Sequence, residues 1–152
     1  MLGRGTYQFN KDANFNFQLN RVVMWGNGDP DEIAGISDGI TDSAGWVRAL
    51  TGLAKKAAEE GRVERQIGYL RMSEFFMYDS DPAKLDTYRR AKELFYRFYA
   101  DKITERNLIR SEVPYGNGTL PVLSAKAAGT CKGRILLHGG NDSYCDAFMT
   151  VL

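Results

Sequence analysis

A short aliphatic run that ends in His-Gly-Gly constrains the fold of this chain more than any other feature. Residues 135–137 are Ile-Leu-Leu, and His138, Gly139 and Gly140 follow directly. An apolar run of this kind between glycines is typical of a buried strand. Adjacent glycines lack a Cβ, so their backbone N–H groups can approach a bound group closely at the strand end. The sequence therefore predicts a buried strand that opens into a loop with available amide donors.

Helical patterns occupy the part of the chain before this run. Apolar side chains recur there at spacings of three and four residues, and Asp29 before Pro30 and Asp81 before Pro82 are typical of helix starts. Gly61 ends an amphipathic pattern that begins at Ser43. These signals predict helices over residues 15–25, 30–37, 43–60, 62–78 and from 82 onward, the last with an inward stripe of Leu85, Tyr88, Ala91, Phe95, Phe98 and Tyr99.

The fourth of these helices is apolar over a wide arc, and we expect it to be buried on two sides. Near its end, Phe75 and Phe76 are candidates for lining a substrate pocket. The alternative is a place in the core, which is the commoner role for aromatic residues at helical spacing.

Beyond residue 103 the pattern changes from helical to extended. Residues 106–113 alternate loosely, residues 114–118 form a turn signal, and residues 119–124 are a second extended run. We expect a hairpin, a surface loop over residues 125–132, the strand that ends at His138, and a helix from Ser143. The chain is thus expected to divide into a helical region, residues 1–103, and a strand-bearing region, residues 104–152.

Composition narrows the class of protein. The net charge is +1, which gives no reason to expect a nucleic-acid partner. Cys131 and Cys145 match no metal-ligand spacing, and we expect neither a metal nor a cofactor. The sequence contains no apolar run of the roughly 18 residues that span a bilayer. Nor does an apolar signal segment follow Met1. We therefore expect a soluble cytoplasmic protein without a membrane partner.

Serine catalysis needs a general base, and His138 is the single histidine of the sequence. Because His138 belongs to a strand end, we expect it to support the loop by hydrogen bonding and not to act as a base. The letters GISDG at residues 35–39 match a nucleophile elbow around Ser37. No apolar strand precedes them, so Ser37 is predicted to be a helix-terminal or turn serine.

Several segments resemble one group of α/β-hydrolases, the 2,6-dihydroxypseudooxynicotine hydrolase-like enzymes and fungal pigment-pathway hydrolases. The fold class implied is α/β: an incomplete α/β-hydrolase fold with an N-terminal helical lid region followed by the first strands of the central sheet. The segments are DSAGW at 42–46, LA at 53–54, GYLRMSEFF at 68–76, YRRAKELF at 88–95, EVPYGNGTLP at 112–121 and HGGNDS at 138–143.

The resemblance implies a role for the loop after the aliphatic run. In such enzymes this loop supplies one amide of the oxyanion hole, and Gly140 and Asn141 are both candidates for the donor. His138, Gly139 and Asp142 would support the loop, and Asp142 is also placed to cap the following helix. The alternative for the two glycines is a tight turn from strand to helix. The nucleophile, acid and base of the family are expected beyond Leu152.

The function implied is that of the N-terminal portion of a serine hydrolase, such as an esterase, which transfers an acyl group of a small-molecule substrate to water and is inactive alone. The bond that is cleaved can be an ester, an amide or an activated carbon–carbon bond, and the sequence does not distinguish among these three. The alternatives are a truncated, non-catalytic or helical interaction module, or one half of a split hydrolase. The expected partners are a second copy, through the helical region, or a complementing C-terminal segment.

Overall fold

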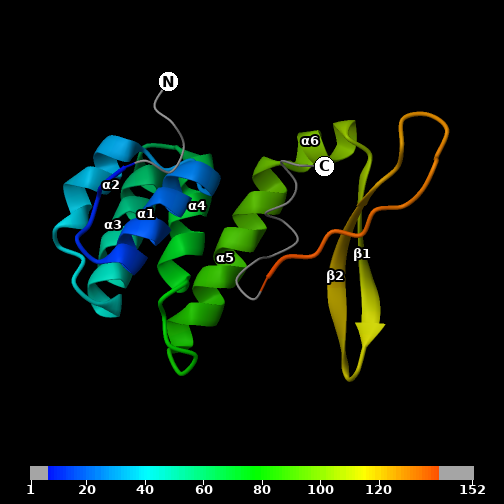
Figure 1. Ribbon diagram of the computed structural model, residues 1–152. Helices are drawn as coiled ribbons and strands as arrows, with labels where there is room; N and C mark the ends of the chain where they lie inside the picture. Colours follow the sequence, from blue (N-terminus) through cyan, green and yellow to red (C-terminus); the bar gives the residue numbers. More distant parts are fainter. Residues whose placement is uncertain (1–6, 141–152) are drawn as a thin grey trace. The chain divides into compact units, whose positions relative to one another are not determined.

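The computed structural model describes residues 7–140, which form six helices and two strands (Figure 1). Contacts divide the chain into two units, one ending at Phe98 and the other beginning at Tyr99. The expected boundary near residue 103 falls inside the short helix α6, Ala100–Glu105, because α6 packs against the first strand. A helical unit is thus followed by a smaller unit that carries the strands.

The first unit contains five helices, and each corresponds to one predicted from the sequence. The fourth ends earlier than the expected residue 78, because the chain turns after Glu74. The helices are α1 (Ala13–Trp25), α2 (Pro30–Ser37), α3 (Ser43–Glu59), α4 (Val63–Glu74) and α5 (Pro82–Phe98).

Aspartate side chains cap the first three helices. The Asp29 carboxylate accepts hydrogen bonds from the backbone N–H groups of Asp31 and Glu32, and Pro30 occupies the first helical position. Asp42 caps α3 in the same way through the N–H of Gly45, at 2.6 Å. These contacts satisfy amide donors that have no partner within a helix, so the helix starts are set locally by the sequence.

The core of the helical unit lies between α1, α3 and α4. Trp46 is fully buried, and its indole Nε1 donates to the backbone carbonyl of Met72 at 2.6 Å. This bond allows a polar ring nitrogen to be buried without loss of hydrogen bonding. The other large side chains with almost no exposure are Tyr69, Leu19, Ile33, Ile40, Leu50 and Val22.

The end of α1 and the middle of α4 meet through two glycines. A Cβ added to Gly68 would lie 1.9 Å from the carbonyl oxygen of Gly26, which is far inside van der Waals contact. Gly26 itself donates its N–H to the carbonyl of Val22 and ends α1. A side chain at position 68 would therefore force the two backbones apart.

The inward face of α5 is narrower than the sequence predicts. Ala91 and Phe95 are buried as expected, and Leu94 joins them, but Leu85 and Phe98 are 51% and 45% exposed. The prediction of a wider buried stripe is wrong because α5 packs mainly against one neighbour, α4. Only the side chains that face α4 are covered.

The second unit contains the predicted hairpin, which is confirmed. Strands β1, Leu108–Tyr115, and β2, Gly118–Ala125, pair antiparallel with Leu108 opposite Ala125 and Tyr115 opposite Gly118. Gly116 begins the two-residue turn at φ +55°, a conformation that glycine adopts without steric cost.

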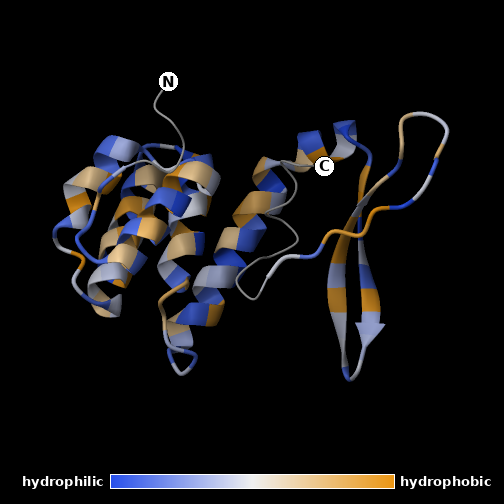
Figure 2. Ribbon diagram, in the orientation of Figure 1, coloured by the Kyte–Doolittle hydropathy of each residue, from blue (hydrophilic) through white to orange (hydrophobic). Residues whose placement is uncertain are grey.

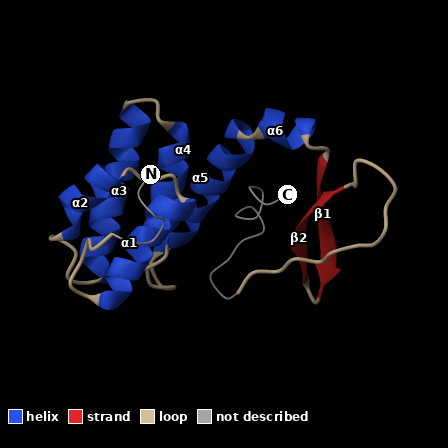
Figure 3. Cartoon of the chain, turned by 45° about the horizontal axis from the view of Figure 1, so that its top comes forward, coloured by secondary structure: helices blue, strands red, loops and turns tan. Residues whose placement is uncertain are grey.

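The prediction of a buried strand over residues 135–137 is wrong. Residues 126–140 lie outside helices and strands, as the tan loop in Figure 3 shows, and Ile135 and Leu136 are 89% and 88% exposed. Figure 2 shows the aliphatic run in orange along this loop. A strand is stable only beside another strand, and within residues 7–140 the sheet consists of β1 and β2 alone.

At the level of fold class, the described part of the chain is mainly helical with one antiparallel hairpin and contains no parallel sheet. None of the helices in this part is long and apolar enough to cross a membrane.

Candidate functional site

The loop predicted to supply oxyanion donors is open and exposed. His138 lies at the surface, and its Nδ1 is 2.9 Å from the carbonyl oxygen of Gly139. A Cβ built on Gly140 would meet nothing within 4 Å. Asn141 and Asp142 fall outside the described residues. Residues 138–140 themselves belong to neither a helix nor a strand.

Ser37 is a helix-terminal serine, as predicted. It is the last residue of α2, and its hydroxyl donates to the carbonyl of Ala34 at 2.9 Å. The side chain is 4% exposed, so it is not presented to solvent as a nucleophile elbow requires.

Phe75 and Phe76 lie just after α4 with different surroundings. The ring of Phe76 packs edge-on against Trp46 at 5.0 Å and against Phe15 at 5.4 Å between centroids. Phe75 contacts Phe76 and the guanidinium of Arg21, whose carbon lies 5.5 Å from its ring centroid. Phe76 therefore contributes to the aromatic core, whereas Phe75 supports a residue of the surface groove on α1.

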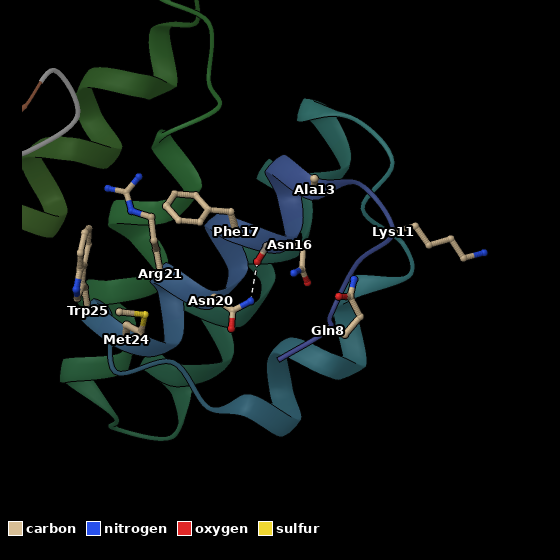
Figure 4. Close-up of a pocket in the computed structure, with 9 residues that line it drawn as sticks. All are labelled: Gln8, Lys11, Ala13, Asn16, Phe17, Asn20, Arg21, Met24 and Trp25. Carbon is tan, nitrogen blue, oxygen red and sulfur yellow. Dashed lines mark hydrogen bonds between the residues drawn. The ribbon is translucent and has the colours of Figure 1, made fainter. Parts of the chain in front are cut away.

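This groove is a concave surface feature of the helical unit, with a volume of about 350 Å³. It runs along the solvent-facing side of α1, and Figure 4 shows Phe17, Arg21 and Trp25 projecting from that helix. Phe17 is 61% exposed and Trp25 is 66% exposed. The lining is completed by Gln8, Lys11, Ala13, Asn16, Asn20 and Met24.

Arg21 gives the groove its charge. Its guanidinium carbon lies 4.8 Å from the ring centroid of Trp25, and one terminal nitrogen donates to Gln18 at 2.8 Å. Its Nε is buried without a hydrogen-bond partner. Lys11 adds a second cation to the lining, which includes no acidic side chain. The groove therefore combines exposed aromatic rings with the positive charge of Arg21.

The groove was not predicted from the sequence. In the helix predicted over residues 15–25, Leu19 and Val22 lie on the apolar face and are buried. A signal was present, because Phe17, Arg21 and Trp25 recur at four-residue spacing outside that stripe.

A second polar cluster joins α2 to α4 and serves to hold the helices together. Both terminal nitrogens of Arg62 donate to the Glu32 carboxylate, at 2.9 and 2.8 Å, and the Tyr69 hydroxyl donates to it at 2.8 Å. Lys56 pairs with the same carboxylate at 2.9 Å. The Arg62 bonds, aided by Lys56 and Tyr69, lower the pKa of Glu32 to about 2.

Tyr69 is tied to the same cluster from the other side. Its hydroxyl accepts the backbone N–H of Asp29 at 3.0 Å, and burial raises its pKa to about 12. Glu32, Lys56, Arg62 and Tyr69 thus all have partners within this cluster. Within residues 7–140 no group of three or more His, Cys, Asp and Glu side chains is placed to hold a metal ion.

Comparison of the sequence with protein-family models and with curated proteins finds no match.

Proposed function

We propose that this chain is the N-terminal portion of a serine hydrolase, which contributes the helical lid, the first strands and part of the oxyanion hole. The observation that carries the proposal is the order of elements: a capped helical unit, then an antiparallel hairpin, then an exposed aliphatic run that ends in His138-Gly139-Gly140. This order fits the start of an α/β-hydrolase, in which the strand before the oxyanion loop is flanked by strands that come later in the chain.

Exposed apolar surface in the second unit supports this proposal. Val113 and Leu120 of the hairpin are 48% and 49% exposed. Among residues 7–140, the two most exposed large aliphatic side chains, Ile135 and Leu136, belong to the run at residues 135–137. Leaving such side chains in water costs about 25 cal/mol for each Å² of apolar surface. A further polypeptide segment that pairs with the run would bury them and complete the sheet.

In the completed enzyme the chemistry would be acyl transfer to water. A serine of the completing segment attacks the carbonyl carbon of a small-molecule substrate, and a histidine of that segment accepts the hydroxyl proton. The amide of Gly140 or Asn141 donates to the oxygen that becomes negatively charged. The helical unit limits access of water to the site.

The first test is the intact mass of the natively expressed protein, combined with labelling by a fluorophosphonate that reacts with activated serines. The proposal expects labelling on a species larger than the 17.0 kDa chain. A bare 17.0 kDa chain that stays unlabelled would overturn it.

Proline substitutions test the oxyanion role in the labelled species, because proline removes the backbone N–H. We expect Gly140→Pro or Asn141→Pro to lower turnover of an ester by about 100-fold, whereas Gly129→Pro, in the preceding exposed loop, leaves turnover near the wild-type value.

The groove on α1 favours a second candidate, a helical interaction module without catalysis. It would bind a group that carries a negative charge beside an apolar surface, because the Arg21 guanidinium lies over the Trp25 ring and Phe17 lines the same groove. Titration of the tryptophan fluorescence with 1-naphthoate, and with neutral 1-naphthylmethanol as the matched control, tests this candidate. Saturable quenching by the anion that is lost in Arg21→Met supports it, and equal quenching by both compounds contradicts it.

A further inference from the structure

The hairpin of the second unit has surface that its own strands leave open. Within residues 7–140 the sheet consists of two strands, so β1 and β2 each have one edge without a neighbouring strand. Leu108 is the one buried side chain in these strands. A two-stranded hairpin is marginally stable in water, whereas three or more strands with an apolar face are stable. An added strand would therefore stabilise this unit.

The two edges differ in their ability to accept a strand. In a hairpin with a two-residue turn, the pair next to the turn, Tyr115 and Gly118, exchanges both hydrogen bonds, and the pattern alternates from there. The N–H groups of even-numbered residues in β1 and of odd-numbered residues in β2 thus point outward. Pro121 interrupts the outer edge of β2 at its centre, whereas Pro114 lies near the end of β1. The outer edge of β1 is the better acceptor.

The outer edge of β1 is complementary to a second copy of itself. If two β1 strands pair antiparallel about Ser111, Arg110 of each strand lies opposite Glu112 of the other, and the two residues exchange backbone hydrogen bonds. On the opposite face, Ile109 lies across from Val113 of the other copy. Opposite charges and apolar side chains placed directly across from each other stabilise an antiparallel pair.

We propose that β1 is a homodimerisation edge that pairs with β1 of a second copy about Ser111. The two hairpins then form one four-stranded antiparallel sheet. The apolar side chains that each hairpin exposes come together on one face of this sheet, namely Ile109, Val113, Tyr115 and Leu120, which are 47%, 48%, 71% and 49% exposed in the single chain. The proposal does not depend on catalysis, because it uses no residue of the oxyanion loop.

Cysteine cross-linking tests the register. The background variant carries Cys131→Ser and Cys145→Ser, so that it has no native thiol. In this background, Ser111→Cys places the two new thiols opposite each other at the two-fold axis of the dimer. They form a non-hydrogen-bonded pair, in which the Cα atoms are about 4.5 Å apart and a disulfide fits. We expect rapid formation of a covalent dimer. The matched control is Ser124→Cys, which lies on the same face but on β2, opposite Ile109 of its own chain. Equal cross-linking rates for the two variants would overturn the proposed register.

Charge reversal tests the edge itself. Each of the single substitutions Glu112→Arg and Arg110→Glu gives residues 110 and 112 the same charge, and these residues face each other at two places in the dimer. Each is therefore expected to raise the dissociation constant of the dimer about tenfold or more. The double variant Arg110→Glu with Glu112→Arg restores opposite charges and is expected to restore the dimer. Sedimentation measures the oligomeric state, and circular dichroism verifies that each variant is folded.

Two results would overturn the proposal. One is a wild-type chain that remains monomeric at high micromolar concentration. The other is a dimer whose dissociation constant is the same in both single charge variants as in the wild type, which would place the contact elsewhere. Loss of the dimer in folded single variants, with recovery in the double variant, supports pairing through β1.

Discussion

Glu32 is the residue on which the polar contacts of the helical unit converge. Its side chain is 13% exposed and accepts hydrogen bonds from Arg62 and Tyr69 while it pairs with Lys56. Lys56 belongs to the end of α3, and Arg62 and Tyr69 belong to the N-cap and the middle of α4, so one carboxylate links α2 to both helices. Loss of its charge would leave Arg62 with a weaker partner.

The substitution Glu32→Gln is expected to lower the free energy of unfolding by about 2 kcal/mol, because a neutral amide binds Arg62 less strongly than a carboxylate. Urea denaturation measures the change. The matched control is Glu59→Gln, whose carboxylate is 66% exposed and lies 3.9 Å from Lys55. The control should change stability by less than about 0.5 kcal/mol. Similar losses in both variants would contradict a special role for Glu32.

The same carboxylate should make stability depend on pH in the acid range. Its pKa falls from 4.5 to about 2 on folding, chiefly through the Arg62 hydrogen bonds. A lowered pKa contributes stability that is fully present above 4.5 and is lost as the pH falls from 4.5 towards about 2. Urea denaturation at several pH values should therefore show the difference between wild type and Glu32→Gln shrinking across this window. A difference that stays constant would contradict the assignment.

A third prediction at the scale of one residue concerns Gly68. Gly68→Ala is expected to destabilise the protein by about 2 kcal/mol or more, because its Cβ would overlap the carbonyl oxygen of Gly26. Gly52→Ala, in α3, is the control, since a Cβ there meets nothing within 4 Å. The control is expected to stabilise the helix by up to about 1 kcal/mol. Thermal unfolding of the pair should give shifts of opposite sign.

At the scale of the element, helix α3 depends on its cap. Asp42→Ala removes the acceptor for the N–H of Gly45, and we expect a loss of about 1 kcal/mol in the free energy of unfolding. Asp86→Ala, where the carboxylate is 82% exposed in α5, should have little effect. Chemical denaturation compares the two variants, and an equal effect of both would mean that the cap contributes nothing.

Elements differ in how well the sequence predicts them. The helix starts at Pro30 and Pro82 were predicted because a cap and a proline act within a few residues. The hairpin was predicted for the same reason, since its turn is local. The width of the buried stripe on α5 was not predicted, because exposure of Leu85 and Phe98 depends on how many helices surround α5.

At the scale of the whole molecule, the two units should differ in how strongly their backbone amides are protected from hydrogen exchange. Amide hydrogen exchange is expected to be slowest in α3 and α4, which hold the core, and fast over residues 133–140, which lie outside helices and strands. Slow exchange at residues 135–137 in the chain alone would contradict the exposed run. A completing segment, once identified by mass, should slow exchange at those residues specifically.

The sequence by itself determined where the helices and the hairpin form, because periodicity, caps and the Gly116 turn act over a few residues. The helical pattern also indicated part of the buried face, such as Ala91 and Phe95, but only the tertiary structure decided how far burial extends. It placed Phe76 in the aromatic core, left a charged groove along α1, and left Ile135 in solvent instead of in a buried strand. The physical reason is that burial and strand pairing depend on neighbours distant in the sequence, and residues 7–140 provide no strand beside the aliphatic run.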